Sequence, residues 1–204
     1  MIKNNTVKTP SSLINFSKII SNFFNPLTSL FIYFAYSSSL KYTFAESLKH
    51  FLPLLIIVAI PISGWIYYNV KKGNYSNMDV SNRKQRKSLY FFIAGALILY
   101  LICDYFFNEN FDLIIAFLLI LLLLMQLSNY FIKSSMHTAF NIFVAALFFS
   151  VNPVLGLVWL GIAILVGITR IILKRHTPKE VISGSLIAVL VSFIYLYANI
   201  QIQH

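Results

Sequence analysis

The chain has 204 residues, of which 58% are hydrophobic and only 11% are charged, with a formal net charge of +10. Soluble domains carry about 25% charged residues, so this composition and a mean hydropathy of +0.76 favour an integral membrane protein. Nucleic-acid binding is not expected, because no soluble basic domain exists to carry the charge. The basic residues suit membrane surfaces and phosphate groups instead.

Residues 1–18 are predicted to form a polar N-terminal tail, and residues 19–204 a single membrane-embedded domain. The domain is expected to be an all-α bundle with about six to seven transmembrane helices, because spanning helices need about 20 apolar residues. One charge-free run, 139–169, is long enough for two short helices, which we expect to separate at "VNP" because proline begins helices but does not continue them. The expected spans are 27–40, 53–70, 89–103, 113–132, the two helices within 139–169, and 181–200.

The basic residues are distributed unequally between the two faces that these spans define. If the loops alternate between faces, 14 of the 16 Lys and Arg residues lie on one face, and only Lys41 and Lys49 lie on the other. Because cytoplasmic loops carry an excess of Lys and Arg, the basic face is expected to be cytoplasmic. The expected location is a bacterial-type inner cell membrane.

Three polar segments lie on this basic face: "MDVSNRKQRKS" (78–88), "IKSSMHTAF" (132–140) and "TRIILKRHTPKE" (169–180). Helical hairpins separate them, so each returns to the same side of the membrane. Two histidines, His137 and His176, lie in these segments. The three segments are therefore expected to meet and form a site.

The sequence around His176 has two interpretations. Thr177, Pro178 and Glu180 are typical of a helix start, with Thr177 as the N-cap and Glu180 as the capping acid. In addition, residues four apart share a helix face, so Glu180 can hold one ring nitrogen of His176 and leave the other free as a nucleophile. The two interpretations are compatible.

His137 is either an interfacial histidine with a solvated ring or a general acid, because an unperturbed imidazole titrates near pH 6.5. Ser135 to His137 are expected at a helix N-terminus, which suits a phosphate oxygen. Nearby cations could hold a phosphoryl group or simply extend to the membrane surface. The candidate phosphate-binding residues are Arg170, Lys133, Ser135, Arg86 and Arg83.

The third segment resembles the third motif of the type 2 phosphatidic acid phosphatase and vanadium haloperoxidase superfamily, which is Ser-Arg, five residues, His, three residues, Asp. Here Thr169-Arg170, His176 and Glu180 keep that spacing. The second motif, Pro-Ser-Gly-His, is similar to "SSMH", 134–137. The first motif, Lys, six residues, Arg-Pro, is matched only at Arg86, and Asp79 stands in place of the lysine. The pattern looks like a divergent bacterial membrane branch.

The resemblance implies a phosphatase that needs no metal or other cofactor. His176 would attack phosphorus to form a phosphohistidine, Glu180 would orient the ring, and His137 would protonate the leaving oxygen. The implied substrate is a lipid with a phosphomonoester or diphosphate head group, such as a phosphatidate-type lipid or an isoprenyl diphosphate.

Two other functions remain open from the sequence. The chain could be a non-catalytic membrane protein whose basic face binds anionic lipid or a partner. His137, His176 and Glu180 could also hold zinc, although the nearby cations would oppose a divalent ion.

Overall fold

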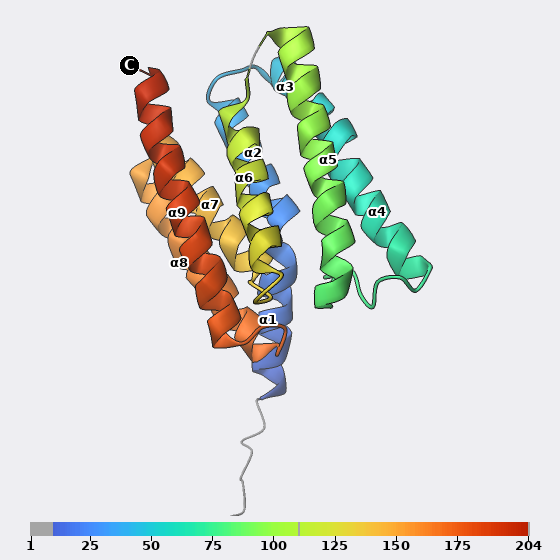
Figure 1. Cartoon of the computed structure of the whole chain (residues 1–204). Helices are drawn as coiled ribbons and strands as arrows, with labels where there is room; N and C mark the ends of the chain where they lie inside the picture. The colour runs from blue at the N-terminus through green and yellow to red at the C-terminus, as the bar shows by residue number, and fades with distance from the viewer. Residues whose placement is uncertain (1–9, 110, 204) are drawn as a thin grey trace, which may run out of the picture.

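The computed structural model describes residues 10–109 and 111–203, and this part of the chain contains helices and turns without strands (Figure 1). The all-α expectation is therefore confirmed for the described residues. The helices are α1 (Ser11–Phe23), α2 (Pro26–Ser39), α3 (Phe44–Leu54), the π-helical segment η1 (Leu55–Ala59), α4 (Ile60–Lys71), α5 (Arg83–Asn108), α6 (Leu113–Ser128), α7 (Met136–Val151), α8 (Pro153–Ile172) and α9 (Pro178–Gln203).

The helix boundaries follow from capping residues. The predicted break at "VNP" is confirmed: α7 ends at Val151, and α8 begins at Pro153. Between them, the Asn152 side chain accepts hydrogen bonds from the first amides of α8, which have no partner within the helix. Asp112 and Ser135 cap α6 and α7 in the same way.

The span expected to begin at Pro53 begins earlier. A capping box between Thr43 and Glu46 starts α3 at Phe44, so Pro53 lies inside a helix. Proline removes one backbone donor from the helical ladder, and the π-helical segment η1 follows directly. This local rewinding keeps the helix continuous to Lys71.

Among the residues that the structure describes, four helical segments are long and apolar enough to cross a membrane, and α6 and α7 are shorter apolar helices. Several apolar helices thus indicate a multi-pass membrane protein. The expected number of six to seven spanning helices stays a prediction. The expected first span, 27–40, falls on α2, whose 14 residues are fewer than the about 20 that a spanning helix needs. The four segments are Phe44–Lys71, Arg83–Asn108, Pro153–Ile172 and Pro178–Ile202.

Helix α1 overlaps the region expected to be a polar tail. Residues 11–18 form its first two turns, whereas residues 1–9 lie outside the described part of the chain. α1 packs against α8, and its Ser17 and Ser21 are buried. Tertiary contacts therefore place a mostly polar segment against the bundle.

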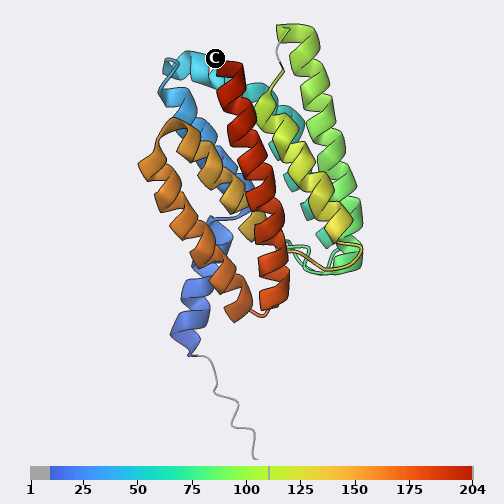
Figure 2. The same cartoon turned by 60° about the vertical axis from the view of Figure 1, so that its left-hand side comes forward.

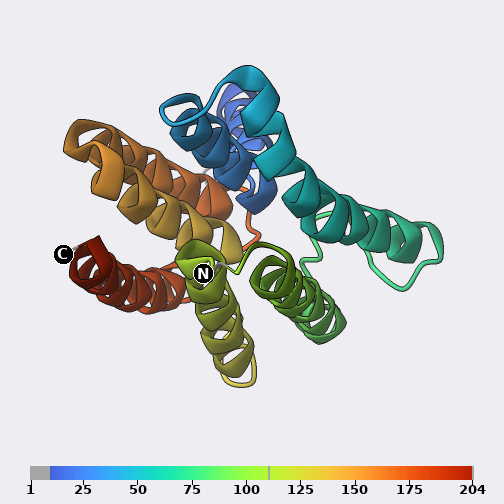
Figure 3. The same cartoon turned by 90° about the horizontal axis from the view of Figure 1, so that it is seen from above.

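Helix α7 forms the centre of the bundle, where residues 138–148 are all buried. It packs against α2, α8 and α9, and α9 also runs beside α6 (Figure 2). Seen along the helices, α7 and α8 lie on one side and α4 and α5 on the other, with α2 and α6 between them (Figure 3).

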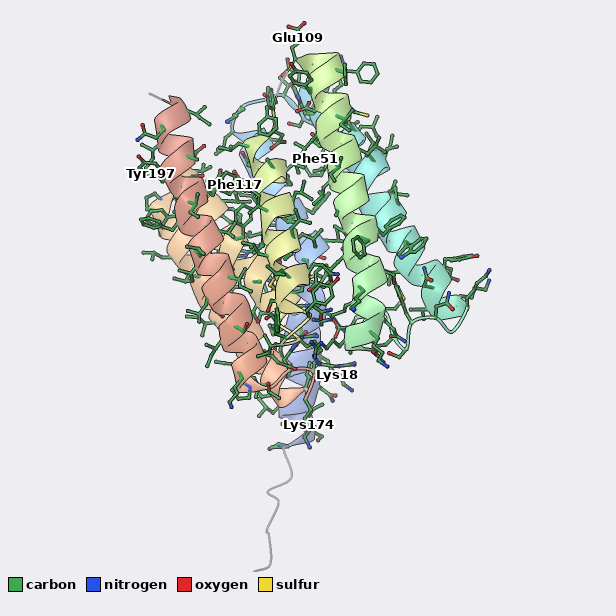
Figure 4. The ribbon with its side chains drawn as sticks, viewed as in Figure 1. Lys18, Phe51, Glu109, Phe117, Lys174 and Tyr197 are labelled. Carbon is green, nitrogen blue, oxygen red and sulfur yellow. The ribbon has the colours of Figure 1, made fainter. Side chains whose placement is uncertain are left out.

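Three inter-helix turns lie at one end of the bundle. The turns after α4, α6 and α8 are all at the lower end of Figure 1, and the last helix ends at the opposite end. Lys18 and Lys174 lie at this lower end, whereas Glu109 lies at the upper one (Figure 4). The polar segments 78–88, 132–140 and 169–180 are thereby brought to the same end.

The α7–α8 hairpin depends on a glycine contact. A Cβ added at Gly156 would lie 2.6 Å from Phe149 Cα and Cβ, whereas one at Gly161 in the same helix would meet nothing within 4 Å. We expect Gly156→Ala to destabilise the protein by about 1–3 kcal/mol through overpacking, measured as a lower thermal midpoint in detergent.

Gly161→Ala is the matched control, because alanine favours a helix over glycine by up to about 1 kcal/mol and has free space there. Equal midpoints for the two variants would contradict the close helix approach.

Candidate active site

A buried arginine, Arg86, joins the three polar segments. Its side chain is 3% exposed and projects from the first turn of α5. Nε donates to the carbonyl of Val80 at 3.0 Å, and Nη1 donates to the carbonyl of Ser134 at 2.9 Å. Nη2 lies 3.2 Å from Nε2 of His176. One guanidinium thus fixes the turn before α5, the entry to α7 and the candidate nucleophile.

The His176 ring is held from both sides. Its Nδ1 lies 3.0 Å from Glu180 Oε2, and Arg86 occupies the Nε2 side. Because a guanidinium only donates hydrogen bonds, Nε2 accepts and Nδ1 carries the proton that is donated to Glu180. The lone pair needed for nucleophilic attack is therefore on Nε2.

Glu180 performs both tasks that the sequence suggested. Its Oε2 accepts the amide of Thr177 at 3.0 Å, and its own amide donates to Thr177 Oγ1 at 3.3 Å. The capping box at the start of α9 therefore exists beside the contact with His176.

The surroundings keep His176 neutral. Burial is the largest cause and the charges of Arg86 and Arg170 add to it, lowering the pKa of His176 to about 2. Burial also lowers the pKa of Lys133, against the opposing attraction of Glu180. A neutral imidazole among cations can act as a nucleophile toward an anionic group.

Lys133 and Arg175 lie beside His176 and Glu180 in the same group of contacts. Lys133 Nζ donates to the carbonyl of Arg175 at 2.9 Å and lies 3.8 Å from Glu180 Oε2. Arg175 in turn donates to Ser81 Oγ at 3.0 Å. These contacts tie the α8–α9 turn to both other segments.

His137 and Arg170 converge on Asp79. Arg170 Nη2 donates to Asp79 Oδ2 at 2.6 Å, and His137 Nε2 lies 3.5 Å from Asp79 Oδ1. A second Arg170 nitrogen, Nη1, donates to Ser21 Oγ at 3.0 Å. Burial acts to raise the pKa of Asp79, but the attraction of His137 and Arg170 outweighs it and holds this pKa below its usual value.

Two of the candidate phosphate-binding residues have other contacts. Ser135 is fully buried; its hydroxyl bonds to Thr138 Oγ1, and its amide donates to the carbonyl of Glu180 at 3.0 Å. Arg83 is exposed and donates to the carbonyls of Asn129 and Tyr130. Ser135 thus lies at the site as a packing residue, and Arg83 points to the end of α6.

A metal centre is not formed by the residues that the structure describes. No group of three His, Cys, Asp or Glu side chains in these ranges is placed to hold a metal ion. His137 faces Asp79, and Glu180 contacts His176 and Lys133.

Sequence reasoning missed the role of three residues. In the sequence, Asp79 stands out only as a mismatch to the first motif, and Arg175 is not among the candidate site residues. Asp79 could have been found from its position seven residues before Arg86, which is the first-motif spacing. No sequence signal indicated Ser21, because its contact with Arg170 depends on the packing of α1.

Part of the chain matches a known protein family. Residues 126–202 match the PAP2 superfamily, which confirms the resemblance to the type 2 phosphatidic acid phosphatase superfamily. The matched region carries His137, Arg170, His176 and Glu180, whereas Asp79 and Arg86 lie before it. Searches of curated proteins and of solved structures gave no match.

The tautomer and charge of His176 are open to direct measurement. Because the pKa is lowered to about 2, we expect its ring to stay neutral and Nδ1-protonated from about pH 8 to about pH 5, where an ordinary imidazole titrates. Nitrogen-15 NMR of histidine-labelled protein measures this, with His176→Gln identifying the signal. A titration midpoint near pH 6.5 would contradict the buried, arginine-flanked environment.

Proposed function

We propose that this chain is an integral membrane lipid phosphatase that acts through a phosphohistidine intermediate. PAP2 superfamily membership already suggests phosphatase-type activity in a membrane-associated protein. The observation that carries the finer proposal is the neutral His176, whose Nε2 lone pair faces Arg86 while Glu180 holds Nδ1.

The residues suit the two steps of such a reaction. Arg86 Nη2 turns from His176 Nε2 to a phosphoryl oxygen, and the freed Nε2 lone pair attacks phosphorus: a P–N bond forms, and the bond from phosphorus to the leaving oxygen breaks. His137 protonates that oxygen. Water then attacks the phosphohistidine and His137 takes its proton; the P–N bond breaks, its electron pair returns to Nε2, and inorganic phosphate leaves. Arg86 and Arg170 hold the charged phosphoryl oxygens, which is the main demand of phosphoryl transfer.

A cavity lined in part by His137 and Asp79 supports a lipid substrate. It has a volume of about 500 Å³, within the range of about 300–1,000 Å³ typical of ligand pockets. Asp79 and His137 line it near the turns, and its other lining residues are mostly apolar. They include Leu30, Phe34, Val58, Leu97, Leu118 and Phe140.

This arrangement suits an amphiphilic substrate, with the phosphate at the turns and the hydrocarbon among the helices. The proposed substrates are a phosphatidate-type lipid or an isoprenyl diphosphate. By the unequal distribution of Lys and Arg, we propose that the site faces the cytoplasm.

Removal of the nucleophile tests the reaction. His176→Ala should lower phosphate release from these lipids by at least about 10³-fold, because alanine cannot form the covalent phosphohistidine intermediate. The measurement is inorganic phosphate released by purified protein in mixed micelles.

His50→Ala is the matched control, since His50 is an exposed histidine that stacks on Tyr42 in another part of the chain. A radiolabelled phosphoryl group should be trapped on the wild-type chain in an acid-labile, base-stable linkage and be lost in His176→Ala. Equal rates for wild type and His176→Ala would rule out the proposed reaction and leave anionic-lipid binding as the alternative.

Filling the cavity tests separately whether it binds the hydrocarbon chain of the substrate. Leu97 is buried in α5 and lines the cavity, so Leu97→Trp should lower the hydrolysis of a long-chain lipid phosphate by about tenfold, or 1.4 kcal/mol of transition-state binding. Hydrolysis of a small water-soluble phosphate ester should change by less than about twofold.

Leu99→Trp controls for the added indole, because Leu99 lies in the same helix but is 52% exposed. An equal loss with both substrates in Leu97→Trp would show that the cavity does not hold the lipid chain.

A further inference from the structure

Asp79 places a carboxylate among cationic side chains, where an anionic ligand would be expected to bind. Four cationic side chains surround this part of the site, namely Arg86, Arg170, Lys133 and Arg175. In the motif that the segment resembles, the position seven residues before Arg86 holds a lysine. Here the sign of the charge is reversed.

The contacts of Asp79 are those that a bound phosphate would make. One oxygen, Oδ2, accepts from Arg170 at 2.6 Å. The other, Oδ1, lies 3.5 Å from His137 Nε2 without a hydrogen-bond partner, although it is buried. A guanidinium on one oxygen and an imidazole near the other is the environment of a phosphoryl group in the proposed reaction.

The backbone on the C-terminal side of Asp79 is fixed. Val80 is 1% exposed and adopts a φ of 44°, which β-branched residues rarely do. Arg86 holds Val80 in this conformation by donating to its carbonyl, and Arg175 donates to the Ser81 hydroxyl. Two site arginines therefore hold the backbone that delivers the carboxylate.

Arg170 is already paired with one anion. Its Nη1 donates to Ser21 Oγ and its Nη2 to Asp79 Oδ2, and its Nε is buried without a hydrogen-bond partner. An arriving phosphoryl oxygen therefore shares this cation with the Asp79 carboxylate. A carboxylate that remained beside the phosphoryl group would also repel it.

We propose that Asp79 is a built-in competitor for the phosphate site: its carboxylate occupies Arg170 and faces His137 until a phosphoryl group displaces it. The inference rests on the proposed function, because it takes the same residues as the phosphate site. Asp79 thereby sets the affinity for phosphate-bearing ligands and for released inorganic phosphate.

The test is the binding of inorganic phosphate to the purified full chain, measured by calorimetry in detergent. Asp79→Asn keeps the size of the side chain and removes its charge, so the variant should bind phosphate at least about tenfold more tightly than wild type. Asp112→Asn is the matched control: Asp112 caps α6, and asparagine caps equally well. Unchanged or weaker binding by Asp79→Asn would overturn the proposal.

A second variant covers the case in which Asp79→Asn does not fold. Asp79→Ala leaves a space that acetate can fill, so acetate should raise its thermal midpoint and phosphate should compete with acetate. A folded Asp79→Ala protein whose thermal midpoint does not change with acetate would also overturn the proposal. These binding measurements do not require catalysis. If Asp79→Asn binds phosphate more tightly but the wild-type protein hydrolyses no lipid, the proposed phosphatase activity is wrong and the competition between Asp79 and phosphate still holds.

Discussion

The buried Arg86 guanidinium is the contact on which the candidate site depends. It projects from α5 and reaches the carbonyls of Val80 and Ser134 and the ring of His176, which lie on three separate segments of the chain. A cation in such a buried place is expensive unless its donors are satisfied. Here each kind of nitrogen in the group has an acceptor, so the same bonds that stabilise the charge also position the imidazole. A lysine could not replace it, because an ammonium lacks the planar arrangement of donors.

Glu180 shows how local structure and chemistry use one side chain. The carboxylate closes the capping box of α9 and accepts from His176, and the i,i+4 spacing makes both contacts compatible. The start of a helix is a rigid place for such a group, because its backbone geometry is fixed by the helix. Asn141 provides a comparable link in α7: its amide donates to the carbonyls of His137 and Phe24, and its oxygen accepts from Ser29 and Trp159.

The sequence predicted the parts of this arrangement that depend on short spacings. The pairing of His176 with Glu180 and the break before Pro153 follow from helix periodicity and capping, which are local. The helical class follows from composition. The contacts of Arg83 with the end of α6 and the packing of α1 on α8 depend on segments that are distant in the sequence, so no short spacing predicts them. The partner of Arg170 was missed for the same reason, although the position of Asp79 relative to Arg86 was visible.

Most of the cavity wall comes from a different part of the chain than the two histidines, although His137 itself lines the cavity. His137 and His176 lie in the region 126–202 that matches the PAP2 superfamily, whereas most of the cavity wall belongs to α2, α3, η1, α4 and α5. Substitutions in these earlier helices can widen, shorten or close the compartment while the imidazoles keep their places. If the proposed function holds, selectivity for the hydrocarbon portion of the substrate can therefore change independently of the residues that carry out the reaction.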